Sequence, residues 1–268
     1  MALFDDYNLL IGIVKEIDGV LSIGKSGGEN IPTHNESDID IFVFCEQIPD
    51  VKTRQSALIK LDSVISKIKI SETVGKFWGV CDFITIDDTE ICLMYFAIAD
   101  INREIEDVLN GSRLDRENEY FYPTGRCATF LSMHIIYDKI GYISDMKDKL
   151  SVYPNSFAEK LYNHHICKIN HIEDFERAIQ REDVLFYHST LELAIDHFLQ
   201  ALFALNKCYF PSRKRTLHFI ENFKYKPLNC SERLLKVIQL GSEAKTLSQS
   251  YDIWTTLCKE LLDIRRTE

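Results

Sequence analysis

The sequence predicts an α+β protein, in which a small mixed-sheet domain is followed by an all-α helical bundle. The chain has 268 residues, of which 46% are hydrophobic and 27% charged, as in soluble globular proteins of one or two domains. Strand-like patterns occur only before about residue 125. Helical periodicity, interrupted by prolines, fills the remainder. We therefore predict two domains, residues 1–125 and 126–268.

The first domain alternates helix and strand patterns. Apolar spacing predicts helices at 4–17, 51–70 and 101–109, and strands at 20–23, 38–45, 77–86 and 90–98. Asp87-Asp88-Thr89 predicts a hairpin between the last two strands. Residues 24–36 are rich in Gly, Pro, Asn, Thr and Ser, which indicates a loop between the first two strands.

The second domain is predicted to be helical throughout. Its expected helices are 126–138, 144–150, 155–181, 183–207, 213–222, 230–241 and 244–265. The segment 183–207 is apolar on almost every side, so we expect it to lie at the centre of the bundle.

The charge balance bears on partners and location. Lys and Arg total 31 against 41 Asp and Glu, and the net charge of −10 disfavours binding to nucleic acid phosphates. No run approaches the roughly 18 apolar residues of a membrane helix, and no signal peptide is evident. The eight cysteines are scattered and form no CxxC pair, so we expect reduced, buried thiols in a cytoplasmic protein without a membrane partner.

The pattern that indicates chemistry is an acid pair at the start of the second strand. Asp38 and Asp40 are two residues apart, so their side chains share one face of the strand, about 7 Å apart. Two carboxylates at this spacing repel each other unless a cation lies between them, and they suit Mg²⁺. The first strand leads into Gly24-Lys25-Ser26-Gly27-Gly28, where glycine amides and a hydroxyl can contact phosphate oxygens.

This arrangement resembles the nucleotidyltransferase superfamily of the DNA polymerase beta type. The matching residues are Gly24, Ser26, Gly27 and the run Ser37-Asp38-Ile39-Asp40, and the resemblance covers roughly residues 1–110. It implies that Asp38 and Asp40 are catalytic and hold Mg²⁺. It also implies that Gly24, Lys25, Ser26, Gly27 and Ser37 bind the nucleotide. The second domain looks like that of bacterial small-molecule nucleotidyltransferases, such as the lincosamide and aminoglycoside resistance enzymes.

The chain departs from the superfamily pattern in two ways. The usual adjacent Gly-Ser is here Gly24-Lys25-Ser26, so either Ser26 or the Gly27 amide could contact phosphate. The superfamily also carries a third carboxylate on a later strand. Asp82 is our first choice for this catalytic acid and Glu90 the second, while Cys92 stands near the place where some relatives carry an acid.

Other signals concern the helical domain. Lys214, in a basic patch with Lys207, Arg213 and Arg215, is predicted to contact the triphosphate or the acceptor. Glu192 and Asp196, one helical turn apart, could hold a cationic acceptor or act as a base. His164, Cys167 and His171 share a helix face and offer an alternative zinc site, although surface and packing roles are the simpler interpretation.

The predicted function is metal-dependent transfer of a nucleoside monophosphate from a nucleoside triphosphate to a hydroxyl group of a small-molecule acceptor. The main alternative is a nucleotide-binding regulatory protein with weak or no transfer, for example half of a toxin–antitoxin pair. A further alternative is nucleotidylation of an RNA or a protein. The nucleotide, the acceptor and the oligomeric state are left open by the sequence.

Overall fold

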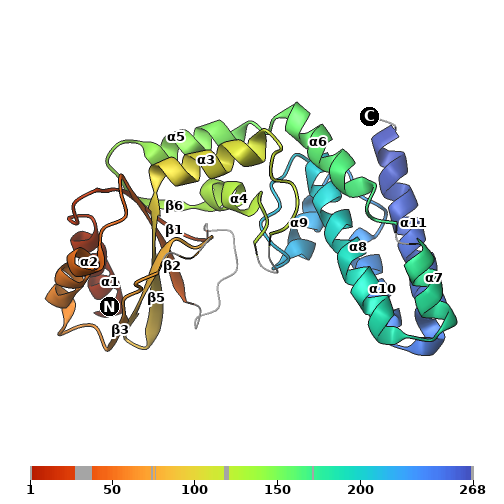
Figure 1. Ribbon diagram of the computed structural model, residues 1–268, viewed down its shortest axis with the longest axis horizontal. Coiled ribbons are helices and arrows are strands. Elements are labelled where there is room, and N and C mark those ends of the chain that lie inside the picture. The colour runs from red at the N-terminus through yellow and green to blue at the C-terminus, as the bar shows by residue number, and fades with distance from the viewer. Residues whose placement is uncertain are drawn as a thin grey trace. The chain divides into compact units, whose positions relative to one another are not determined.

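The computed structural model describes residues 2–27, 38–73, 75, 77–117, 121–170 and 172–266 (Figure 1). The chain forms two compact units, residues 1–107 with 126–152, and residues 108–125 with 153–268. The predicted fold class is confirmed, since a six-stranded mixed sheet is followed by a helical region. The units differ from the two predicted ranges because residues 126–152 pack with the sheet, and residues 108–125 pack with the later helices.

The elements up to residue 151 build the sheet and the helices around it. They are α1 (Ala2–Val14), β1 (Val20–Lys25), β2 (Ile39–Cys45), α2 (Val51–Leu58), β3 (Lys67–Lys69), β4 (Val80–Ile86), β5 (Thr89–Ala97), α3 (Ile98–Leu109), α4 (Gly125–Ser132), β6 (His134–Asp138) and α5 (Tyr142–Ser151). The strand order is β3-β4-β5-β2-β1-β6. The β2–β5 pair is parallel, and the other neighbouring strands are antiparallel.

One face of the sheet packs against α1 and α2, and we call it the α1 face. Strand alternation directs Ile41 and Val43 of β2 to this face, together with Leu93 of β5 and Ile84 of β4. These side chains are fully buried with Leu10 and Val14 of α1 and Leu58 of α2 in one apolar core.

The opposite face is the α5 face, and aromatic side chains cover much of it. Phe42, Phe44 and Phe96 stack on one another across β2 and β5. The Phe44 ring also lies 5.1 Å from that of Phe130 in α4 and 5.2 Å from that of Tyr142 in α5, measured between centroids. The two helices therefore cover the part of this face that Phe44 occupies.

The sixth strand was not predicted. Residues 126–138 were expected to form one helix, but α4 ends at Ser132 and β6 follows. Its residues His-Ile-Ile-Tyr-Asp suit a strand, and they pair with the edge of β1. Asp138 then accepts hydrogen bonds from the Ser22 hydroxyl, at 2.6 Å, and from the Ser144 amide of α5, at 3.0 Å. Tertiary pairing with a distant edge thus outweighs local helical spacing.

Two further predicted helices are interrupted. The helix expected at 51–70 ends with α2 and the short 3₁₀ turn Ile59–Leu61, and β3 follows on the edge of the sheet. The helix expected at 155–181 divides into α6 and α7, described below. The predicted hairpin is confirmed, because Asp87 and Asp88 adopt positive φ values of 46° and 62° between β4 and β5.

The second unit is built from α6 (Asn155–Ile166), α7 (Ile172–Gln180), α8 (Val184–Leu205), α9 (Thr216–Asn222), α10 (Cys230–Leu240) and α11 (Leu247–Arg266). The prediction of a central helix is confirmed, because α8 contacts α6, α7 and α11 and buries 13 of its 22 residues. In the part of the chain that the structure describes, no helix is long and apolar enough to cross a membrane.

Candidate functional site

The register of β1 and β2 brings Ser26 beside Asp40. Gly24 pairs with Phe42 and Lys25 with Ile41, and the Ser26 amide donates a 2.9 Å hydrogen bond to the Asp40 carbonyl oxygen. Side chains directly opposite each other in such a pair share a face. Ser26 and Asp40 therefore lie together on the α5 face, one step beyond the aromatic residue Phe42.

A third acid lies beside the acid pair, at the start of the neighbouring strand β5. Asp40 pairs with Cys92, while Asp38 and Glu90 each stand one residue before the paired Ile39 and Ile91. Asp38 and Glu90 are exposed, and Asp40 is half-buried. Three carboxylates thus occupy one end of the α5 face, with Glu90 at the strand position beside Asp38. Carboxylate oxygens are the donors that Mg²⁺ prefers.

A thiol pair lies next to these acids. Cys92 is buried at the position opposite Asp40, and Cys81 comes from β4 on the same face. A hydrogen bond from Cys92 lowers the pKa of Cys81, and the same bond together with burial raises the pKa of Cys92. A neutral thiol is a poor Mg²⁺ ligand, so Cys92 does not supply the third acid. The sequence analysis did not predict the hydrogen bond between the Cys81 and Cys92 thiols, although strand alternation places both side chains on this face.

The glycine segment behaves differently from the predicted phosphate loop. Gly24 and Lys25 belong to β1 rather than to a loop. A Cβ on Gly24 would overlap the buried Met133 side chain, so this glycine permits close packing. Lys25 pairs with Ile41 and faces the α1 face, away from Asp40. Gly27 has a positive φ of 82°, and among the described residues no atom would meet a Cβ on it. Of the glycine segment, Ser26 and Gly27 are the described residues next to the acids. The predicted contact Ser37 lies outside the described residues.

Asp82 is not on the same face as Asp38 and Asp40, which corrects its assignment as the third catalytic acid. In β4 it alternates in phase with Val80 and Ile84, so it faces the α1 face and is fully buried. There it forms an ion pair with Arg54 of α2 and accepts a 3.0 Å hydrogen bond from the Ser71 amide.

Arg54 is 2% exposed and completes this buried network. Its Nε donates to the Pro49 carbonyl oxygen at 3.0 Å and its Nη2 to that of Ser71 at 2.7 Å. Burial raises the pKa of Asp82, against the opposing effect of the hydrogen bond from Arg54. The Arg54–Asp82 ion pair connects α2, the segment before β4 and β4 itself, so its role is to stabilise the packing of these elements.

The predicted acids of the helical unit are also engaged. Asp196 of α8 is buried and accepts hydrogen bonds from Tyr122, from Gln200 at 3.0 Å and from Arg213 at 3.2 Å. Glu192 pairs with Arg213 at 3.0 Å and with Arg116 at 3.3 Å. The two arginines occupy the positions that a cationic acceptor was expected to take. Burial and the bond to Asp196 raise the pKa of Tyr122 to about 12.

Lys214 is exposed in the segment before α9, where its amide donates to the Ser212 hydroxyl at 3.1 Å. Its contact with a triphosphate or an acceptor stays a prediction.

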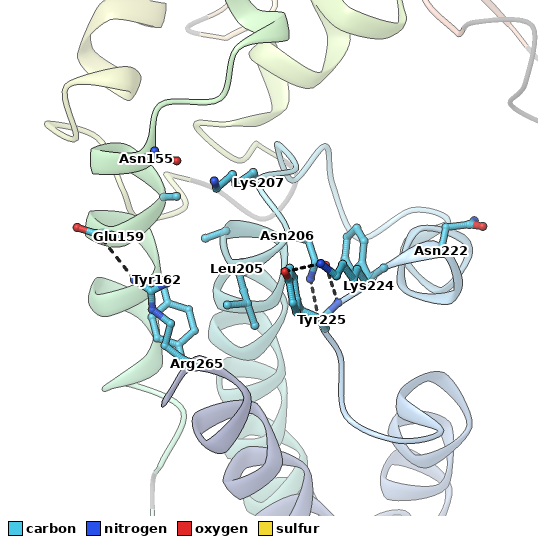
Figure 2. A pocket seen from close by; sticks show the side chains of 13 residues that line it. Asn155, Glu159, Tyr162, Leu205, Asn206, Lys207, Asn222, Lys224, Tyr225 and Arg265 are labelled. Carbon is cyan, nitrogen blue, oxygen red and sulfur yellow. Dashed lines mark hydrogen bonds and ion pairs between the residues drawn. The ribbon is translucent and has the colours of Figure 1, made fainter. Parts of the chain in front are cut away.

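A pocket of about 670 Å³ lies in the second unit (Figure 2), within the range of small-molecule sites. Side chains from α6, from the end of α8, from the segment after α9 and from α11 surround it. Its lining carries three cations, Lys207, Lys224 and Arg265, and one acid, Glu159, which pairs with Arg265 at 3.5 Å. This balance favours an anionic ligand over a cationic one.

Comparison with known proteins gives limited similarity. A family model described as a domain of unknown function (DUF4037) matches residues 122–215. No curated protein matches the chain. The chain is similar in structure to a nucleotidyltransferase-like protein from Exiguobacterium sibiricum 255-15, with 11% identity, a TM-score of 0.42 and coverage of 98% of this chain and 79% of that chain.

A second solved structure is the soluble domain of CorA from Methanocaldococcus jannaschii, with 12% identity, a TM-score of 0.16 and coverage of 92% of this chain and 96% of that chain. Neither likeness is close enough to assign an activity, so the function is argued from the residues themselves.

Proposed function

We propose that the protein transfers a nucleoside monophosphate from a nucleoside triphosphate to a hydroxyl group of a small molecule, in a metal-dependent reaction. The observation that carries the proposal is the register of β1 and β2. It sets Ser26 beside Asp40 on one face, next to Asp38, at the end of the sheet beyond Phe42. The polymerase beta-type nucleotidyltransferases that the sequence resembles carry a serine before such an acid pair.

The acid pair fits Mg²⁺, because Asp38 and Asp40 offer carboxylate oxygens on one face of the strand and Asp38 is exposed. Bound there, the ion would neutralise charge on the triphosphate and on the departing pyrophosphate. The Ser26 hydroxyl and the Gly27 amide are the donors for phosphate oxygens. Glu90 takes the place proposed for Asp82 and accepts the proton of the attacking hydroxyl.

A second candidate function is nucleotide binding without efficient transfer, as in a regulatory protein. The observation that favours it is Cys92, which stands opposite Asp40 where an acid would complete the set. Glu90 decides between the two candidates. If Glu90 is the third acid, Glu90→Gln abolishes pyrophosphate release and leaves triphosphate binding within a few-fold of wild type. If the protein only binds nucleotide, the wild type releases no pyrophosphate above background.

The experiment that tests the proposal is calorimetric titration with ATP, GTP, CTP and UTP, each in Mg²⁺ and in chelator. We expect at least one triphosphate to bind only with the divalent ion, because the acid pair would otherwise repel the phosphates. Asp40→Asn should lose this binding, and Asp62→Asn, which removes an exposed acid at the end of the 3₁₀ turn Ile59–Leu61, should retain it. Equal affinity for all four with and without metal would contradict the proposal.

A further inference from the structure

A cluster of metal-ligating side chains lies in the second unit and has no part in the proposed transfer reaction. It consists of Asp115, in the segment after α3, and the neighbouring His164 and His165 of α6. One ligand atom of each residue lies within 4.8 Å of the others. The Asp115 Oδ1 and the His164 Nε2 are 2.8 Å apart.

Lys168 shows that a cation is already accommodated at this point. Its Nζ lies 2.8 Å from the Asp115 Oδ1 and 2.8 Å from the His164 Nε2, so the three atoms form a triangle. Lys168 is in the turn that follows α6, four residues after His164, and its side chain is 35% exposed. The ammonium group can therefore turn toward solvent without disturbing a packed core.

The separation of the first two ligands suits a transition metal. At metal–ligand distances of about 2.0–2.1 Å, two ligands at right angles are about 2.9 Å apart, and tetrahedral ligands are about 3.4 Å apart. A shift of a few tenths of an ångström therefore brings Asp115 and His164 into either geometry.

His165 is the buried member of the cluster. Its Nε2 lies 3.1 Å from the Leu114 carbonyl oxygen and its Nδ1 lies 2.9 Å from the Nδ1 of His197. An imidazole binds a metal ion through a ring nitrogen that carries no proton. A metal ion at Nε2 would replace the proton that now bonds to Leu114, and Nδ1–H would then donate to His197, as in the supporting hydrogen bonds that orient metal-bound imidazoles.

We propose that Asp115, His164 and His165 bind a divalent transition metal ion, and that the Lys168 ammonium group leaves when the ion binds. Two imidazoles and one carboxylate are typical ligands of Zn²⁺, whereas Mg²⁺ prefers oxygen donors alone. The ion joins the segment that contains Asp115 to α6, and water completes its coordination. His197 is a positioning residue, since it acts through His165.

This site differs from the zinc alternative considered from sequence, which combined His164 with Cys167 and His171. The Cys167 thiol instead donates to the His164 carbonyl oxygen at 3.4 Å. His171 lies outside the described residues. Helical spacing finds residues on one face of a single helix, and it could not reveal that Asp115, 49 residues before His164, approaches the same point.

The test uses the full chain, stripped of metal with chelator and dialysed, with Co²⁺ and Zn²⁺ as probes. Titration with Co²⁺ should give visible absorption bands that saturate at one equivalent and vanish when Zn²⁺ is added. Zn²⁺ at 100 times its Kd should raise the Tm by about 5 °C. Asp115→Asn and His164→Ala should lose both signals, and His218→Ala, an exposed histidine of the same unit, should keep them.

Lys168→Met separates a metal site from a simple ion-pair cluster. It removes the competing cation, so we expect Zn²⁺ to bind at least about as tightly as to wild type and the Co²⁺ bands to persist. His197→Ala should weaken Zn²⁺ binding by about 10–100-fold while the bands remain. No Co²⁺ bands in wild type and in Lys168→Met would overturn the proposal. So would equal Zn²⁺ affinity in His164→Ala and wild type. The Lys168→Met result decides even if His164→Ala fails to fold.

Discussion

Asp40 and Asp82 are both strand aspartates of the same sheet, and they differ in what surrounds them. Asp82 is fully buried on the α1 face, where Arg54 and the Ser71 amide bond it. Asp40 is half-buried on the α5 face, with Ser26, Asp38 and Glu90 as neighbours along the edge. A buried carboxylate that is ion-paired with an arginine stabilises the fold. Neighbouring carboxylates that are exposed or half-buried are suited to bind a cation.

The largest expected effect comes from breaking the buried pair. Asp82→Ala should lower the free energy of unfolding by about 3–5 kcal/mol, because Arg54 is then left charged and buried without its partner. Urea unfolding at neutral pH measures the change, with Asp62→Asn as the control for loss of an exposed acid. A loss below about 1 kcal/mol would contradict the structural role of Asp82.

The glycines of the β1 edge allow a second comparison. Gly24→Ala should cost about 1–3 kcal/mol, because the new Cβ must displace the buried Met133 and Ile143 side chains. Among the described residues, the Cβ of Gly27→Ala meets no atom within 4 Å, and the change should cost only about 1 kcal/mol, from its positive φ. Thermal unfolding of both variants tests the ranking. The reverse order would mean that Gly24 is not packed as the structure shows.

The buried imidazole of the second unit predicts acid sensitivity. The folded-state pKa of His165 is lowered to about 3 from 6.5, so its contribution to stability is fully present above pH 6.5. It is lost as the pH falls toward 3, because the unfolded chain binds the proton more readily. At pH 5.5 we expect a loss of about 1 kcal/mol relative to pH 7.5. In chelator, His165→Gln should flatten this dependence and His218→Gln should not. An unchanged profile in His165→Gln would show that another group is responsible.

The smallest expected effect is the change in the free energy of unfolding when Asp40 is replaced in the absence of metal. Asp40→Asn removes one of several neighbouring negative charges and keeps the shape of the side chain. The free energy of unfolding without ligand should therefore stay within about 1 kcal/mol of wild type. Chemical unfolding in chelator measures it beside Asp82→Ala. A loss as large as that of Asp82→Ala would mean that both aspartates hold the fold.

Much of this contrast could be predicted from the sequence, and part of it was missed. The spacing of Asp38 and Asp40 and the hairpin at Asp87 and Asp88 follow from local alternation and turn chemistry. The face of Asp82 could have been found in the same way, because Asp82 is in phase with Val80 and Ile84. Its partner could not, since Arg54 comes from a helix 28 residues earlier.

The remaining errors have the same physical origin. β6 forms because β1 offers hydrogen bonds to His134–Asp138. The local sequence around β6 does not indicate that β1 is available for pairing. The metal-ligating cluster depends on Asp115 reaching α6 from a segment 49 residues away. Local periodicity thus predicts most helices and strands, whereas contacts between distant segments decide which charged side chains form ion pairs or clusters.

The most direct test of the nucleotide and metal site is the ligand-induced shift in Tm. Thermal melts of wild type, Asp40→Asn and Asp62→Asn, each with and without Mg²⁺ and the triphosphate that binds best, measure it. We expect wild type and Asp62→Asn to gain several degrees by mass action, and Asp40→Asn to lose most of that gain. If Asp40→Asn melts far lower without ligand and keeps the full shift, Asp40 is structural and the proposed site is contradicted.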